Sequence, residues 1–159
     1  MLTSRRDYIL RIIDEVSRLL ARVIFKRRSG DNEAALQAIV QACERLFSLE
    51  SDKLFQFTPE QHFAMLTRDE PPETARDKVL LYAALNMEAG HIYSKMRNAA
   101  MARASFVNAL QLTLRARTEF PAQNLPEYAP SLAVLREALA DAPLDEATQA
   151  MLKSVESGS

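Results

Sequence analysis

The sequence of 159 residues contains no tryptophan, one cysteine and three glycines. A single cysteine excludes a disulfide within the chain. The sequence also contains neither a glycine-rich phosphate-binding loop nor a nucleophile elbow. No apolar run approaches the ~20 residues that a membrane-spanning helix needs. We therefore expect a cytoplasmic protein with no membrane segment, no cofactor and no enzymatic activity.

The composition that remains favours helices. Alanine, leucine, arginine and glutamate are abundant, and hydrophobic residues make up 48% of the chain. A chain of this length can bury one sizeable core. We therefore interpret residues 1–159 as a single all-α domain of six to seven helices.

The helix boundaries can be read from apolar spacing, capping residues and prolines. Residues 1–50 are expected to form a first hairpin, turned at Gly30 and capped at Asp31. Residues 51–71 are expected to form divergent short helices, one of them started by the capping box that Thr58 and Gln61 can make. Further helices are expected over about 72–96 and from about 99 to 119, and proline-interrupted C-terminal helices over 120–156.

Small and aromatic residues alternate in a specific way along the hairpin of residues 72–119. Gly90 and Ala102 have almost no side chain, which allows two helices to approach closely, while Tyr93 and Phe106 supply bulk beside them. With Ala109, this spacing resembles a tetratricopeptide repeat, a helix-turn-helix unit of about 34 residues. The resemblance implies antiparallel helical hairpins stacked as a short tetratricopeptide-like array.

The start of the chain carries a second resemblance. The segment Arg6-Asp7-Tyr8-Ile9-Leu10-Arg11 is similar to the opening of an uncharacterised family of short bacterial helical proteins. In that family a long first helix also precedes tetratricopeptide-like pairs. The resemblance implies a helical fold and a bacterial origin, and it implies no activity.

The repeat resemblance also indicates a partner-binding face. In tetratricopeptide-like pairs the first helix of each unit lines the concave face, so Ala84, Met87, His91 and Ser94 would face a partner. Peptide-binding members of the family place lysine and asparagine there to hold a carboxylate, and Met87 and His91 differ from that pattern. A groove for an apolar segment fits these residues better. Alternatively, the chain's own tail or middle helix fills the groove and Met87 belongs to the core.

Candidate catalytic and metal-binding residues are few. Glu88 and His91 have the spacing that puts a carboxylate and an imidazole on adjacent helical turns. A metal site needs further ligands, and His62 has no acid three residues before it, so no metal site is expected. We expect His62 to be solvated. Cys43 lies on an apolar stripe and is expected to be a buried, unreactive thiol.

The first helix is basic. Residues 1–28 contain eight Arg or Lys and three acids, a net charge of about +5, whereas residues 119–159 have a net charge of about −5. The two ends should therefore attract each other. Arg11, Arg18, Arg22 and Lys26 lie along one helical face and form a basic strip. This strip could meet nucleic acid or an acidic partner, but a solvated face is the simpler interpretation because the whole chain is slightly acidic.

The sequence predicts a non-catalytic protein-protein interaction or scaffold module with an unidentified protein or peptide partner. Self-association is also expected, because the first helix carries Tyr8, Leu10, Ile24 and Phe25 outside its main apolar stripe. A second copy of the chain could cover these residues, making a homodimer through the first helix, or later helices could cover them instead. The alternative function is a nucleic-acid-associated or regulatory module that uses the basic strip.

Overall fold

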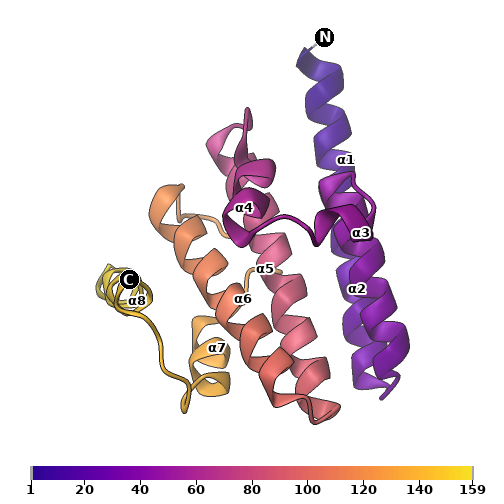
Figure 1. The fold of residues 1–159 in the computed structure, drawn as a ribbon. Helices are drawn as coiled ribbons and strands as arrows, with labels where there is room; N and C mark the ends of the chain where they lie inside the picture. The colour runs from indigo at the N-terminus through magenta and orange to yellow at the C-terminus, as the bar shows by residue number, and fades with distance from the viewer. Residues whose placement is uncertain (1, 159) are drawn as a thin grey trace.

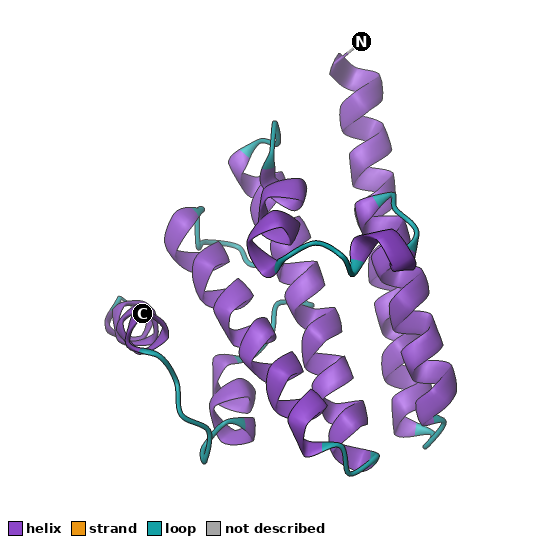
Figure 2. Ribbon diagram, viewed as in Figure 1, coloured by secondary structure: helices purple, strands orange, loops and turns teal. Residues whose placement is uncertain are grey.

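The computed structural model describes residues 2–158, and every regular element within them is a helix (Figures 1 and 2). The predicted all-α class is confirmed. The described chain has eight helices instead of six or seven, because residues 51–54 form a helical turn of their own. The helices are α1 (Leu2–Arg28), α2 (Asn32–Phe47), α3 (Ser51–Leu54), α4 (Pro59–Thr67), α5 (Pro72–Lys95), α6 (Ala99–Glu119), α7 (Leu132–Ala138) and α8 (Glu146–Ser157).

Helices α1 and α2 form the predicted antiparallel hairpin. Gly30 takes a φ of 83°, a left-handed conformation that glycine adopts without strain. The Asp31 side chain then accepts a hydrogen bond from the Ala34 N–H at 3.1 Å, which caps α2. Because α1 is much longer than α2, its N-terminal half extends past the end of α2 (Figure 1).

His62 of α4 connects the short helices α3 and α4 to α5 through hydrogen bonds. The predicted capping box of Thr58 and Gln61 starts α4. The expectation that His62 is solvated was wrong, because its side chain is buried. Its Nε2 lies 2.8 Å from the Leu54 carbonyl oxygen and its Nδ1 lies 3.3 Å from the Tyr82 hydroxyl. A carbonyl only accepts, so Nε2 carries the proton and Nδ1 accepts from Tyr82.

Helices α5 and α6 form the most extensive helix pair in the structure. A Cβ atom on Gly90 would lie 2.7 Å from the Phe106 ring, so the ring packs directly on the glycine backbone. The predicted close approach is confirmed at Gly90. The turn between the helices is capped by Asn98, which accepts from the Met101 N–H at 3.2 Å.

An ion pair crosses from α1 to α5. Arg27 Nε lies 2.5 Å from Glu88 Oε1, and the side chain of Glu88 is only 5% exposed. A buried carboxylate needs such a partner, because desolvation without compensation is costly. Arg27 is therefore partly buried and bridges the two hairpins, although it follows directly after the basic strip in sequence.

The proline-rich segment after α6 runs back across α5. Arg76, which is 4% exposed, donates from Nη1 to the carbonyl oxygens of Pro121 and Gln123 at 2.8 and 2.9 Å. Tyr128 adds a hydrogen bond from its hydroxyl to the Asp77 carbonyl oxygen at 3.2 Å. These contacts order a segment that has no helix of its own, shown as loop in Figure 2.

Helices α7 and α8 pack against α6, on the side away from α1 (Figure 1). Ser131 and Asp145 cap them, and both helices begin within residues 120–156, where C-terminal helices were expected. The basic first helix and the acidic C-terminal region therefore lie on opposite sides of α5 and α6. The expected attraction between the two ends does not bring these helices side by side, because apolar packing on α6 determines where α7 and α8 lie.

No helix in residues 2–158 combines the length and the apolar character that crossing a membrane requires.

Candidate functional site

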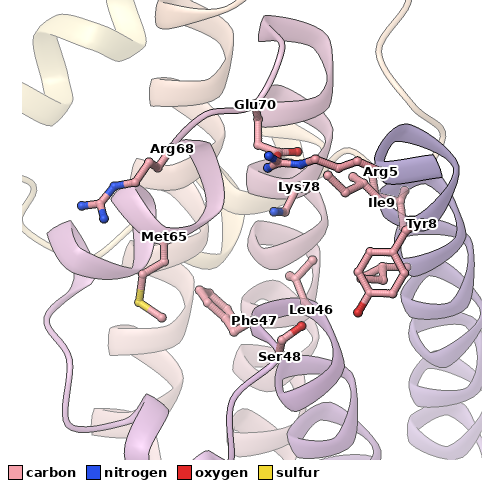
Figure 3. Close-up of a pocket in the computed structure, with 12 residues that line it drawn as sticks. Arg5, Tyr8, Ile9, Leu46, Phe47, Ser48, Met65, Arg68, Glu70 and Lys78 are labelled. Atoms are coloured by element: carbon pink, nitrogen blue, oxygen red, sulfur yellow. The ribbon is translucent and has the colours of Figure 1, made fainter. Parts of the chain in front are cut away.

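A cleft of about 390 Å³ opens beside the N-terminal half of α1. It is bounded by α1, the end of α2, α4 and the start of α5, and it exists because α1 extends past α2. Figure 3 shows Arg5, Glu70 and Lys78 together at one end of this space. The rest of the lining is mainly apolar, with Ser48 and Arg68 as its other polar residues. We call this space the α1 cleft.

Glu70 is the most deeply buried charge in the α1 cleft. Its side chain is 3% exposed, and its Oε1 accepts from Arg5 Nη2 at 3.0 Å. The other oxygen, Oε2, is buried and has no hydrogen-bond donor in the part of the chain that the structure describes. A buried acceptor without a donor costs on the order of 1–3 kcal/mol. The wall of the α1 cleft therefore contains one buried acceptor whose hydrogen bond is not made within the described chain.

The turn between α4 and α5 directs Glu70 into the α1 cleft. Asp69 takes a φ of 58°, which reverses the chain after α4. Two prolines follow, and a residue that precedes proline is held in an extended conformation. Pro72 then starts α5 at a position where the missing N–H has no structural cost. This local rigidity fixes where the Glu70 carboxylate lies.

Lys78 supplies an unpaired cation next to Glu70. Among the described residues it forms no ion pair within 4.0 Å. Burial lowers the pKa of its ammonium group; Glu70 opposes this shift and Arg5 adds to it. Arg68 also lines the rim. With Arg5 and Glu70 neutralising each other, the α1 cleft carries an excess of positive charge.

The remaining wall of the α1 cleft is apolar. Leu46 is 3% exposed, and Phe47 and Met65 are partly buried beside it. Ile12 and Ile13 of α1 face them. A space with an apolar wall and a few convergent polar groups has the composition of a binding site.

The structure separates the residues of the predicted partner-binding face. Ala84 is 2% exposed, so the expectation that it faces a partner was wrong. Met87 packs against the cluster that α6, α7 and α8 form, which matches the alternative in which the chain's own tail fills this groove. His91 is partly buried, with its ring 5.1 Å from that of Phe106. Ser94 is exposed near the end of α5.

The basic strip is a surface feature over most of its length. Arg11, Arg18 and Arg22 are exposed, and Lys26 is partly buried. Arg18 pairs with Asp14 at 3.0 Å, one turn before it on the same helix. An exposed pair of this kind contributes little to stability.

The other candidate groups are placed away from the α1 cleft. Cys43 is 3% exposed, as predicted, and burial raises the pKa of its thiol to about 12. The Glu88 carboxylate is engaged by Arg27. No group of three or more His, Cys, Asp or Glu in the described chain is arranged as a set of metal ligands.

The sequence did not single out Arg5, Glu70 or Lys78. Glu70 stands directly before Pro71-Pro72, and that position was the one available signal. Arg5 and Glu70 are 65 positions apart, and no local pattern connects them. Their proximity depends on how α1 packs against α5.

No known protein family, curated protein or solved structure matches the chain. The tetratricopeptide-like arrangement and the resemblance of the opening segment therefore stay predictions.

Proposed function

We propose that this chain is a non-catalytic protein-interaction module, and that a segment of a partner protein binds in the α1 cleft. The observation that carries the proposal is the combination of an apolar wall with an unsatisfied carboxylate oxygen on Glu70 and an unpaired Lys78. Unpaired polar groups around an apolar surface are complementary to a bound segment. The single thiol of the chain is buried and protonated at neutral pH, which argues against its use as a nucleophile.

Photo-crosslinking tests this proposal directly. Tyr8 lines the rim of the α1 cleft and Phe25 is exposed on the same helix outside it. Benzoylphenylalanine is placed at one position or the other, and the protein is irradiated in the cells that produce it. Apart from a cross-linked dimer of the chain itself, a discrete cross-linked partner protein is expected from position 8 and not from position 25. Met65→Trp, which narrows the α1 cleft, should remove that partner product. The same partner from both positions, or no partner from position 8, would contradict the proposal.

Self-association through α1 is part of the same proposal. In a single copy of the chain, Tyr8 is 49%, Leu10 48% and Phe25 71% exposed. A second copy that packs against α1 would cover these side chains. Sedimentation velocity over a wide concentration range should show a species of twice the chain mass of 17.9 kDa. Leu10→Asp should reduce it. A monomer at all concentrations would remove self-association from the proposal.

The alternative function is nucleic-acid binding by the basic strip. It is favoured by Phe25, an exposed aromatic ring three residues from Arg22, because bases stack on aromatic rings beside arginines. The protein-interaction proposal expects no binding of duplex or single-stranded oligonucleotides at physiological salt. Binding that falls steeply with salt, and is lost when Arg18→Glu and Arg22→Glu are combined, would favour the alternative.

A further inference from the structure

We propose that the α1 cleft selects an acidic peptide segment, whose acidic side chain pairs with Lys78 while one of its main-chain N–H groups donates to Glu70 Oε2. This inference rests on the proposed function and names the chemistry of the bound segment. It follows from three properties of the α1 cleft: its charge, its unsatisfied acceptor and its apolar wall.

The charge of the α1 cleft favours an anion. Arg5 is already neutralised by Glu70 at 3.0 Å, whereas Lys78 has no acidic partner within 4.0 Å among the described residues. The ammonium group is partly desolvated, and an acidic side chain beside it would compensate that loss of hydration. A cationic segment would instead be repelled by Lys78.

The acceptor on Glu70 distinguishes a peptide from a simple organic anion. A hydrocarbon carboxylate could pair with Lys78 but would bring no donor for Oε2, which would stay buried and unsatisfied. A peptide carries an N–H at almost every residue. The same segment can therefore satisfy both groups.

The apolar wall defines what lies next to the acidic residue. Leu46, Phe47 and Met65 form a surface beside the polar end of the α1 cleft (Figure 3). An apolar side chain adjacent to the acid would cover this surface and exclude water from the ion pair, which strengthens it. The expected motif is an aspartate or glutamate flanked by large apolar residues.

A random peptide library displayed on phage is the probe that tests this inference. The library is selected against the full chain, after removal of peptides that also bind Met65→Trp. Enriched peptides are expected to contain an acid next to a large apolar residue. Their dissociation constants are then measured by fluorescence anisotropy with the folded protein.

A double-mutant cycle tests the contact with Lys78. Changing the acid of an enriched peptide to its amide should weaken binding to the wild type about tenfold. The same change should have little effect on binding to Lys78→Met. Lys95→Met, which removes an exposed lysine at the far end of α5, should behave like the wild type. If Lys78→Met folds poorly, the dissociation constants of the acid and amide peptides for the wild-type protein still test whether the acid contributes to binding.

N-methylation tests the contact with Glu70. Methylating one main-chain amide beside the acid should weaken binding to the wild type several-fold, because the donor to Oε2 is lost. The loss should be smaller with Glu70→Gln, while Glu73→Gln, an exposed residue in the first turn of α5, should behave like the wild type.

The outcomes separate this inference from the proposed function. Enriched peptides without an acid, no enrichment at all, or no coupling in either cycle would overturn the inference. The cross-link from position 8 would still support the proposed function in each of those cases. Loss of that cross-link would overturn the proposed function itself.

Discussion

The Phe106 ring of α6 packs on the backbone of Gly90 in α5, at a distance that leaves no room for a side chain. This contact lets α5 and α6 approach each other more closely than they could with a side chain at position 90. Glycine within a helix is normally unfavourable by about 1 kcal/mol relative to alanine. At this position the contact with the ring outweighs the helical preference.

Gly90→Ala should therefore destabilise the protein. The new methyl group would lie 2.7 Å from the Phe106 ring, and overpacking of this kind costs about 1–3 kcal/mol. Combined with Phe106→Leu, the same substitution should become neutral or stabilising, since only the gain in helix propensity remains. Urea denaturation of the four proteins measures both effects. An equal effect of Gly90→Ala in both backgrounds would show that the ring is not the obstacle.

The ion pair between Arg27 and Glu88 predicts a second, non-additive effect. Arg27→Met leaves the buried Glu88 carboxylate without its partner and should lower the free energy of unfolding by about 3 kcal/mol. Adding Glu88→Gln removes the uncompensated charge and should recover part of that loss. Arg18→Met, at an exposed pair, is the matched control and should change stability by less than about 1 kcal/mol. Additive losses from Arg27→Met and Glu88→Gln would contradict this account.

His91 should make stability depend on pH. Burial lowers the pKa of its imidazole, Glu88 opposes the shift and Arg27 adds to it. The unfolded chain then binds the proton more tightly than the folded protein. The neutral His91 therefore contributes to the free energy of unfolding above its ordinary pKa of about 6.5, and this contribution is lost as the pH falls below that value. Thermal denaturation between about pH 7.5 and pH 5.5 should show a steeper loss for the wild type than for His91→Gln. Equal slopes would indicate that His91 is not the titrating group.

Cys43 should be unreactive until the protein unfolds. Its thiol is buried and has a pKa of about 12, so its thiolate population near neutral pH is roughly a thousandfold below that of a free thiol. Reaction with a colorimetric disulfide reagent should be slow in the native state and rapid in concentrated denaturant. Rapid modification of the native protein would show that α2 opens locally around this residue.

The sequence was a good guide to features that depend on a few neighbouring residues. Asp31 and Thr58 cap the helices that they were expected to cap, because a cap is a hydrogen bond across three positions. The packing at Gly90 was also predictable. A glycine in the interior of an apolar helix pattern indicates a close approach of another element.

The candidate site was beyond the reach of local patterns. The sequence indicated that the first helix carries apolar residues outside its main stripe, but it did not show that the first half of α1 would extend beyond α2 and leave a cleft. For the face that contains Ala84 and Met87, local patterns could not decide between an open groove and one filled by the chain's own helices. Periodicity indicates that a surface is covered, and it does not identify the element that covers it.

By itself, the sequence determined that the chain is all-helical, where the main helices begin and end, and that Gly90 allows close packing, because helix propensity, capping and side-chain size act over one or two turns. Only the tertiary structure decided that Arg5 meets Glu70, that Arg27 meets Glu88 and that His62 is buried. Those contacts join residues far apart in the chain, and their formation depends on the packing free energy of the whole assembly of helices.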